Sequence, residues 1–385
     1  MESLVLKNGK IVLDDKVIDG SILVQDGIIT KIVEDKYKEE LTGDKVVSLD
    51  GKIVVPGFVD VHIHGCDGAD LMDCDTESLK KMARFVATRG VTNFLPTTLT
   101  APKEELKKAL ACAGELQNKD IDGGANIFGV HMEGPYFDVA FKGAQDERYM
   151  VKATVEELEE YMSVKKGVLK MMSLSASDDS YLEPIKYLRK NGVICSIGHS
   201  NGYYENVRKA VEAGVTHATH TYNGMRGINH RELGIAGGVL VSDEINAEII
   251  FDGIHVHPKA VELLLRAKGT NRVVLITDAM SATGLADGDY KLGKLDVYVK
   301  DNQARLKTTN SLAGSVLTMD KAFRNVMNLG YSIFDAVKMS STNACKEFGL
   351  NAGSIQIGKR GDFAVLDTDR EVAMTIVGGK IKFEK

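Results

Sequence analysis

Short apolar segments that alternate with polar residues occupy both ends of the chain. Near the N-terminus they cover residues 4–6, 10–13, 21–25 and 28–33, with Asn8-Gly9 and Asp26-Gly27 between them. Asn-Gly and Asp-Gly between alternating residues are strong hairpin signals. The C-terminal end repeats the pattern at 354–357, 362–366 and 374–383. Because neither end can bury a core alone, we expect residues 1–55 and 349–385 to form one small β domain together.

Between these ends the pattern changes to apolar strands that alternate with amphipathic helices. Helical periodicity appears at residues 76–88, 102–116, 155–164 and 181–190. Eight buried strands that alternate with helices predict an α/β fold, a parallel (β/α)8 TIM-like barrel over residues 56–348. Residues 290–306 predict an inserted hairpin after the last of these strands. The eight strands are expected at residues 57–63, 91–99, 126–131, 168–174, 193–197, 215–218, 247–251 and 272–276.

The composition is that of a folded metabolic protein and excludes several other classes. Of the 385 residues, 44% are hydrophobic and 26% are charged, which is typical of a globular protein rather than a disordered or fibrous one. The net charge is −6, and no run of Lys or Arg offers a track for nucleic acid. No apolar segment reaches the length of about 18 residues that a membrane span needs. The five scattered cysteines are typical of a reducing compartment, so we expect a cytoplasmic protein.

Residues that can bind a metal follow the predicted strands. His62 and His64 end the first strand, and residues two apart on a strand point to the same side. Most of the nine histidines lie at such strand ends, whereas chance placement would scatter them. A single one of them would be interpreted as an ordinary core or surface histidine. Several imidazoles and carboxylates at the same end of one barrel need a metal or another partner, because burying them unpaired costs several kcal/mol each.

The types of these residues favour a transition metal. Imidazole and carboxylate ligands suit Zn²⁺ or Fe²⁺ better than Mg²⁺. The active site of a parallel barrel lies at the C-terminal ends of its strands. We therefore expect a divalent ion there, surrounded by His62, His64, Glu133, His199, His220 and Asp278.

A set of motifs resembles the N-acetylglucosamine-6-phosphate deacetylase family, within the amidohydrolase superfamily. The motifs occur in the family's order along nearly the whole chain. They are VPGFVDVHIHG at 55–65, HMEGP at 131–135, KGAQ at 142–145, GHS at 198–200, HTYNGM at 220–225, DGIH at 252–255, TDA at 277–279 and LAGS at 312–315. The resemblance implies a barrel joined to a small β-sandwich that both chain ends build. It also implies metal-dependent hydrolysis of N-acetyl-D-glucosamine 6-phosphate to D-glucosamine 6-phosphate and acetate, in amino-sugar catabolism.

The resemblance also assigns roles to individual residues. Glu133, His199 and His220 match the family's metal ligands. His62 and His64 match a pair that lets some members hold a second ion, with Glu133 bridging, so one or two Zn²⁺ or Fe²⁺ ions are expected. Asp278 matches the catalytic carboxylate, and Gln145 stands where an amide can bond the acetyl oxygen. The sugar phosphate is expected to contact Asn223, Gly224, Arg231, His255, Leu312 and Ala313, with Arg231 supplied by the neighbouring subunit of a homodimer.

Two alternatives stay open at this point. Another amidohydrolase of the cyclic-amidase or dipeptidase type would bridge two metals with a carboxylated Lys on the fourth strand, but residues 168–174 end without a Lys. A catalytically inactive scaffold with the same fold should have lost metal ligands or the acid after the eighth strand. This chain retains Asp278 and all the matched ligands, which favours the deacetylase.

Overall fold

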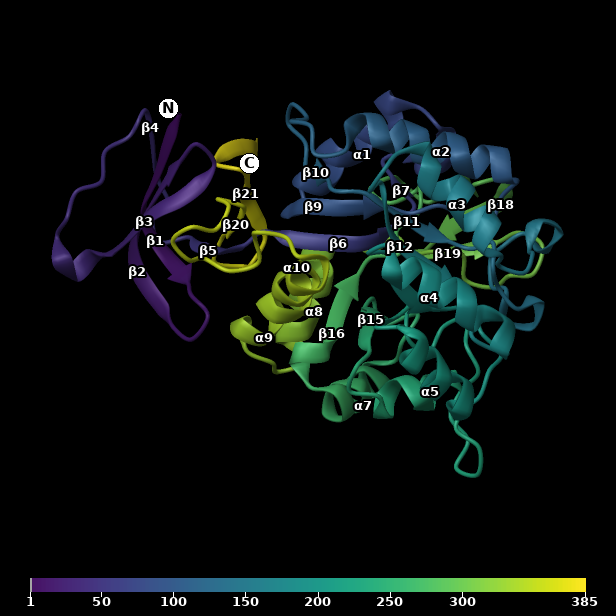
Figure 1. The fold of residues 1–385 in the computed structure, drawn as a ribbon. Helices are drawn as coiled ribbons and strands as arrows, with labels where there is room; N and C mark the ends of the chain where they lie inside the picture. The colour runs from purple at the N-terminus through teal and green to yellow at the C-terminus, as the bar shows by residue number, and fades with distance from the viewer. Residues whose placement is uncertain (1) are drawn as a thin grey trace.

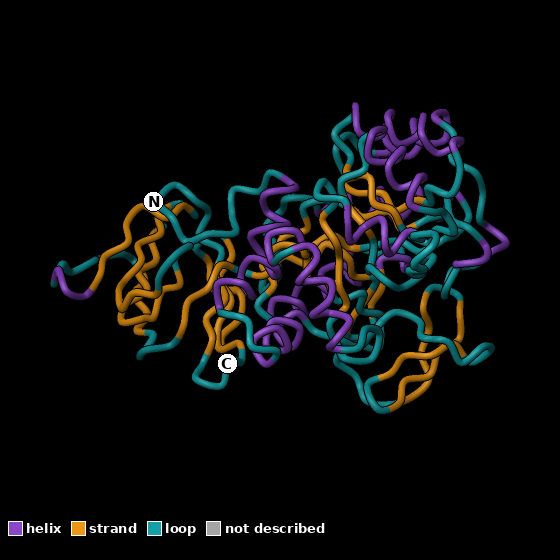
Figure 2. Tube along the Cα trace, turned by 90° about the horizontal axis from the view of Figure 1, so that it is seen from below, coloured by secondary structure: helices purple, strands orange, loops and turns teal. Residues whose placement is uncertain are grey.

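The computed structural model describes residues 2–385, and in it strands from both ends of the chain share one sheet. The strands are β1 (Ser3–Val12), β2 (Val17–Gln25), β3 (Ile28–Glu34), β4 (Lys45–Ser48), β5 (Ile53–Pro56), β20 (Phe363–Leu366), β21 (Val372–Val377) and β22 (Lys380–Glu384). They follow the order β22-β21-β20-β5-β1-β2-β3, with β4 also paired to β1. Figures 1 and 2 show these strands gathered at one end of the molecule, close to both termini.

The pairing of β5 with β20 ties the two chain ends together. Val55 lies opposite Ala364 in an antiparallel register. Between β2 and β3, Asp26 and Gly27 have φ angles of 47° and 81°, the type I′ turn that the Asp-Gly dipeptide predicts. The sheet buries an apolar cluster of its own, in which Phe363 is fully covered. Both chain ends therefore contribute to one packed unit.

The middle of the chain contains two parallel sheets. One has the order β10-β9-β6, and the other runs from β11 to β16 in sequence order. Isolated bridges connect Thr97, just after β9, to His131 in β11, and Ile63 in β6 to Ala279, just after β16. Strands β9 and β6 of one sheet therefore lie beside the two edge strands of the other. The strands are β6 (Phe58–Ile63), β9 (Val91–Pro96), β10 (Asn126–Ile127), β11 (Val130–Glu133), β12 (Leu169–Leu174), β13 (Ile194–Ile197), β14 (His217–Ala218), β15 (Asn246–Ile250) and β16 (Val273–Ile276).

Helices cover the outer side of these strands (Figure 1). Every residue of β6, β9 and β15 is buried, as expected for parallel strands covered on both faces. Asp75 caps the first helix through the backbone amides of Glu77 and Ser78, and that helix buries Leu79, Met82 and Val86 at helical spacing. The helices are α1 (Thr76–Ala87), α2 (Lys103–Leu116), α3 (Val155–Val164), α4 (Leu182–Lys190), α5 (Tyr204–Ala213), α6 (Ile235–Val241), α7 (Pro258–Lys268), α8 (Met319–Asn328), α9 (Ile333–Val337) and α10 (Asn343–Phe348).

A small antiparallel sheet is inserted after β16. It consists of β17 (Gly288–Leu292), β18 (Leu295–Lys300) and β19 (Gln303–Leu306), one strand more than the predicted hairpin. Its inner residues pack with Leu99 and Met280 in a separate apolar cluster. A two-stranded ribbon, β7 (Gly65–Cys66) and β8 (Ala69–Asp70), and the 3-10 helix η2 (Leu71–Asp73) follow β6.

The predicted elements differ from the structure in a few more places. Asn8-Gly9 does not form a hairpin turn, because residues 4–6 and 10–13 belong to the single strand β1, which only shifts its register against β2 between Leu6 and Gly9. The expected strand at 126–131 is divided into β10 and β11. The expected strand at 354–357 is not a strand, because the chain turns at Gly353 and Gly358, both with positive φ, while Ile355 still packs into the core of the terminal sheet. Within residues 2–385, no helix combines the length and the apolar character that crossing a bilayer requires.

Candidate metal centre

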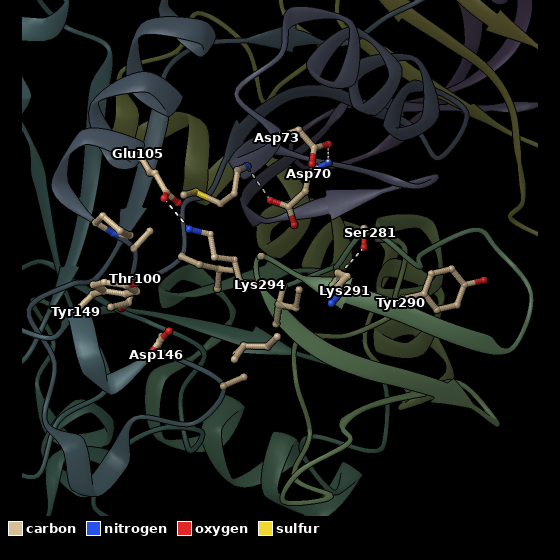
Figure 3. Close-up of a pocket in the computed structure, with 18 of the residues that line it drawn as sticks. Asp70, Asp73, Thr100, Glu105, Asp146, Tyr149, Ser281, Tyr290, Lys291 and Lys294 are labelled. Atoms are coloured by element: carbon tan, nitrogen blue, oxygen red, sulfur yellow. Dashed lines mark hydrogen bonds and ion pairs between the residues drawn. The ribbon is translucent and has the colours of Figure 1, made fainter.

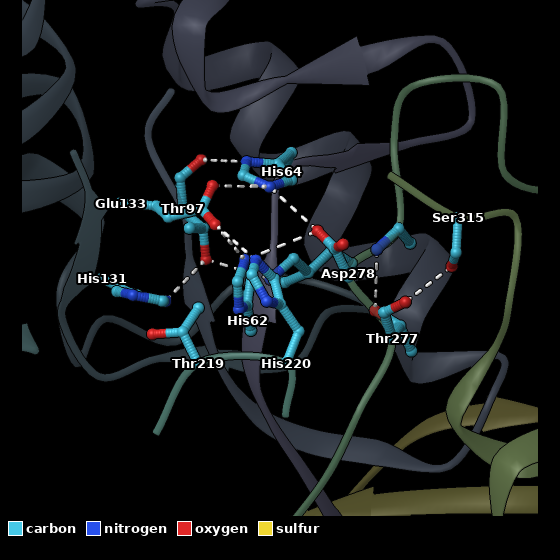
Figure 4. Close-up of polar contacts among 12 residues, drawn as sticks. His62, His64, Thr97, His131, Glu133, Thr219, His220, Thr277, Asp278 and Ser315 are labelled. Atoms are coloured by element: carbon cyan, nitrogen blue, oxygen red, sulfur yellow. Dashed lines mark hydrogen bonds and ion pairs between the residues drawn. The ribbon is translucent and has the colours of Figure 1, made fainter. Parts of the chain in front are cut away.

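Side chains that follow different parallel strands converge at one point of the structure. Figure 4 shows most of them pointing toward one another. Each lies at or just after a strand end, where the chain leaves the sheet and the side chain is free to turn inward. All six are buried, with exposures of 7% or less. They are His62 in β6, His64 just after β6, Glu133 at the end of β11, His199 after β13, His220 after β14 and Asp278 after β16.

Glu133 is the centre of the first group. Its Oε1 lies 3.2 Å from His199 Nε2 and 3.0 Å from His220 Nε2. The two imidazole Nε2 atoms are themselves 3.2 Å apart. One carboxylate and two imidazoles with their ligand atoms this close together form a donor set suited to a transition metal.

A second group adjoins the first. Asp278 Oδ1 lies 3.0 Å from His64 Nε2 and 3.4 Å from His62 Nε2. The other oxygen of Glu133, Oε2, lies 3.4 Å from His64 Nε2. Glu133 therefore faces both groups, which fits the expectation that it could bridge two ions.

The Nδ1 atom of each of these four histidines faces an acceptor outside the cluster. His64, His199 and His220 direct Nδ1 to the backbone oxygens of Thr97, Phe141 and Asn223 at 3.3, 2.7 and 3.1 Å, whereas His62 directs it to the Glu248 carboxylate at 3.0 Å. A proton on Nδ1 leaves a lone pair on Nε2, which is the form that binds a metal. Every Nε2 points into the cluster.

The His62 ring gives a direct test of whether a metal fits. Its Nε2 is buried and has no hydrogen-bond partner among the described residues. A buried polar atom without a partner costs free energy. A cation placed among Nε2, Glu133 and Asp278 would satisfy this atom and neutralise the two carboxylates. The residues present therefore fit a divalent metal.

The charges of the cluster support the same conclusion. Burial alone would raise the pKa of Glu133, but the charge of His62 and the hydrogen bonds of His199 and His220 hold it well below its usual value. Burial lowers the pKa of His64, yet Asp278 and Glu133 outweigh it and raise this pKa to about 9. Without a metal, protons therefore occupy the positions that an ion would take, and ion binding must displace them.

Gln145 is fixed against the same cluster. Its Oε1 accepts a hydrogen bond from the Thr100 amide at 2.7 Å, and its Nε2 donates to Glu133 Oε2 at 2.6 Å. Because the oxygen is committed to the backbone amide, the NH₂ group faces the cluster. An amide nitrogen carries two hydrogens, so one is left for a ligand.

A cavity of about 150 Å³ opens onto the cluster. Asn223, Gly224, His255 and Leu312 line it together with Gln145 and most residues of the cluster. Asp252 positions His255 by accepting from its Nδ1 at 2.7 Å and from its backbone amide at 2.8 Å. The structure thus brings most of the predicted substrate residues to one side of the cluster.

Two predicted residues do not reach this cavity. Arg231 lies in the exposed stretch 227–232, on the loop between β14 and α6. Ala313 is 1% exposed and packs with the inserted sheet, while its neighbours Leu312 and Gly314 line the cavity.

A second cavity, of about 340 Å³, adjoins the first (Figure 3). It lies between η2, the start of α2 and the β17–β18 hairpin, and it shares Leu99, Ala144 and Leu292 with the first cavity. The inserted hairpin therefore covers one side of the site.

Sequence reasoning missed Glu248. This residue occupies the middle of β15, a strand whose residues are all buried. A glutamate within a buried apolar strand was the available signal, because a charged side chain is rarely fully buried unless it is paired. The fourth predicted strand, β12, ends in Ser173 and Leu174 and carries no Lys at its end, as the sequence indicates.

Comparison with known proteins gives consistent matches. A sequence model described as "Amidohydrolase family" matches residues 53–382. The N-acetylglucosamine-6-phosphate deacetylase of Bacillus subtilis is 35% identical over 99% of this chain and 98% of its own length. The N-acetylgalactosamine-6-phosphate deacetylase of Escherichia coli O157:H7 is 33% identical over 94% of both chains.

A solved structure is similar over the same length. It is an aspartate-to-alanine variant of N-acetyl-D-glucosamine-6-phosphate deacetylase from Mycobacterium smegmatis in complex with N-acetyl-D-glucosamine-6-phosphate. Its TM-score is 0.92, with 28% sequence identity and coverage of 99% of this chain and 100% of that one. The family resemblance expected from the motifs is therefore confirmed.

Proposed function

Because the chain belongs to the amidohydrolase family, we propose that it hydrolyses N-acetyl-D-glucosamine 6-phosphate to D-glucosamine 6-phosphate and acetate, a step of amino-sugar catabolism. The observation that carries the proposal is the cluster of four imidazole Nε2 atoms around Glu133 and Asp278, open to a cavity with His255 and Asn223 on its wall. The choice of substrate is supported by the Bacillus and Mycobacterium relatives, both of which are N-acetylglucosamine-6-phosphate deacetylases.

The metal ligands are assigned to the two groups around Glu133. Glu133, His199 and His220 would hold one Zn²⁺ or Fe²⁺ ion, and His62 and His64 would hold a second with Glu133 between the two. When bound, such an ion supplies a nucleophile at neutral pH by lowering the pKa of water, and acts as a Lewis acid on the acetyl carbonyl.

Asp278 is the acid–base residue in this proposal. Burial would raise the pKa of its carboxyl, but the charge of His62 and the hydrogen bond from His64 lower it, so the group is ionised at neutral pH. An ionised carboxylate can accept the proton of the attacking water. The same group then gives that proton to the departing amine nitrogen, without which the tetrahedral intermediate would return to substrate.

Gln145 and the cavity wall position the substrate. The free hydrogen of the Gln145 amide bonds the acetyl oxygen as negative charge develops on it. Asn223, Gly224, Leu312 and His255 contact the sugar phosphate, and Asp252 holds the His255 ring in place. An imidazole and a guanidinium form charge-assisted hydrogen bonds with a phosphate.

The proposal includes a closed barrel and a separate domain formed by the two chain ends. The two parallel sheets close into an eight-stranded barrel over residues 56–348, in which β10 and β11 form one interrupted strand. Residues 1–55 and 349–385 form the small β-sandwich domain. Support comes from the bridges at both sheet edges and from the separate apolar core of the terminal sheet.

The assembly and location are proposed on other grounds. The chain forms a homodimer in which Arg231, on its exposed loop, reaches the phosphate in the neighbouring subunit. The protein is cytoplasmic, which is supported by five cysteines that form no disulfide in the described residues.

Acetate release tests the function. The protein, with its metal content measured, is incubated with N-acetyl-D-glucosamine 6-phosphate and acetate is quantified. We expect stoichiometric acetate, loss of activity after chelation and recovery with Zn²⁺ or Fe²⁺. Absence of acetate from fully metal-loaded protein would refute the proposal. Faster release from N-acetyl-D-galactosamine 6-phosphate, the substrate class named for the Escherichia coli relative, would move the assignment to that epimer.

A further inference from the structure

Glu248 is a fully buried carboxylate next to the metal centre but outside it. It lies in β15, and its side chain has an exposure of 0%. Its Oε2 accepts from His62 Nδ1 at 3.0 Å and from the His220 backbone amide at 2.9 Å. Its Oε1 accepts from His217 Nε2 at 3.1 Å. Both carboxylate oxygens therefore accept hydrogen bonds, and two of the three donors belong to His62 and His220 of the candidate metal centre.

A second carboxylate, that of Glu347, binds the other ring nitrogen of His217. His217 directs Nδ1 to Glu347 in α10 at 2.8 Å, and Thr216 Oγ1 donates to the same carboxylate at 3.3 Å. Burial lowers the pKa of His217, but Glu347 and Glu248 outweigh it and raise this pKa to about 10. The imidazolium donates from both nitrogens, so four side chains form a continuous row from α10 to His62.

The contact with Glu248 determines which nitrogen of His62 carries a proton. An ionised carboxylate only accepts, so His62 carries its hydrogen on Nδ1. Its Nε2 then has a lone pair, and it faces Asp278 at 3.4 Å and Glu133 at 3.7 Å. The other three histidines of the cluster take their Nδ1 acceptors from the backbone. Of these four rings, His62 is the one held by a side chain that substitution can remove.

We propose that Glu248 is a positioning residue that fixes the tautomer and orientation of His62 and thereby builds the second ion position, formed by His62, His64 and Glu133. The first position, at Glu133, His199 and His220, keeps its Nδ1 acceptors when the Glu248 carboxylate is removed. The inference rests on the proposed metal site, but its test needs no substrate.

The test is a titration of Zn²⁺ into metal-free protein, followed by calorimetry and by metal analysis after dialysis. The wild type is expected to bind two ions. Glu248→Leu removes both acceptor oxygens and should weaken the second ion about 10- to 100-fold, the usual effect of losing an outer partner of a metal-binding histidine, while the first ion is retained. Glu248→Gln keeps an acceptor oxygen for His62 and should stay within a few-fold of wild type.

Asp60→Asn is the matched control. Asp60 is also a buried carboxylate beneath the cluster, but it accepts from Thr277 Oγ1 at 2.6 Å and contacts no imidazole ring nitrogen. This variant should bind two ions even where its melting temperature falls. Equal loss of both ions in Glu248→Leu, or full retention of both, would overturn the proposal, as would a wild type that binds one ion.

A measurement on the wild type covers the case in which Glu248→Leu does not fold. Nitrogen-15 NMR of labelled histidine reports which ring nitrogen of His62 carries the proton in zinc-loaded protein, with the resonance assigned by its loss in His62→Gln. The Nδ1–H form is expected, and the Nε2–H form would contradict the proposal. Two bound ions without acetate release would refute the deacetylase and leave the role of Glu248 intact.

Discussion

Three residues of the candidate site adopt a left-handed backbone. His199, His220 and Asp278 have φ angles of 48°, 28° and 49°. None is a glycine, so each conformation costs of order 1–3 kcal/mol and persists only because the surroundings impose it. Each occurs just after a strand, where the turn directs the side chain back over the end of the sheet. These three turns therefore bring the side chains together at the cluster.

Replacing Asp278 by Asn tests its catalytic role. Asn tolerates a positive φ and keeps the size of the side chain, so the backbone should be preserved. It cannot accept and return a proton, and kcat should fall by about 10²–10⁴-fold or more, because both proton transfers use this group. The variant should still bind metal through Glu133, His199 and His220, and KM should stay within a few-fold.

The measurements on Asp278→Asn are kcat, metal content and melting temperature, with Asp60→Asn as a control for the loss of a buried carboxylate. A variant with near-normal kcat and a lowered melting temperature would show that Asp278 serves only to stabilise the loop that follows β16.

The sequence predicts the residues at strand ends of the candidate site but not the residues that depend on contacts between distant segments. His62 and His64 were predictable as a pair because strand geometry places them on one side. Glu133 and Asp278 were predictable as strand ends. The row of Glu248, His217 and Glu347 was not, because it joins residues far apart in the chain through contacts that only the folded chain creates.

At the scale of elements, the strands were easier to predict than the loops that carry the chemistry. Continuous apolar runs locate β6, β9 and β16 within a few residues. The third strand of the insertion, β19, and the turns at Gly353 and Gly358 depend on tertiary packing, which periodicity does not report. The loop after β14 contributes three residues to the lining of the candidate site, His220, Asn223 and Gly224.

Gly224 in that loop is predicted to protect a metal ligand. Its φ is 59°, and a Cβ added there would lie 2.7 Å from His199 Nδ1. Gly224→Ala should therefore displace the His199 ring from its hydrogen bond to the Phe141 oxygen. We expect lower metal content and lower activity together, measured on the same sample.

Gly227 offers a matched control in the same loop. A Cβ there meets nothing within 4 Å, and its φ lies outside the left-handed region. Gly227→Ala should keep both metal and activity. If Gly224→Ala kept its metal, the proposed contact with His199 would not be what requires glycine at this position.

At the scale of the whole molecule, the family resemblance implies a site that Arg231 of a second subunit completes, and the exposed position of Arg231 is compatible with that role. Arg231→Ala alone should reduce kcat/KM about tenfold or more, because a charge-assisted hydrogen bond to the phosphate is lost. Mixed dimers of Arg231→Ala with Asp278→Asn should recover activity. Each mixed dimer holds one site with both groups, so random pairing restores about a quarter of the wild-type activity.

The two variants are unfolded together, refolded and assayed beside each variant treated alone. Activity that does not rise above the sum of the separate variants would place Arg231 in its own subunit's site or outside the site altogether.

The choice of substrate tests the central claim, that this site deacetylates a sugar phosphate. The measurement is kcat/KM for N-acetyl-D-glucosamine 6-phosphate and for unphosphorylated N-acetyl-D-glucosamine, on one preparation with one metal content. Charge-assisted hydrogen bonds of about 1.5–3 kcal/mol each predict at least about a hundredfold preference for the phosphorylated sugar. Equal values for the two sugars would contradict the account and favour another amidohydrolase activity.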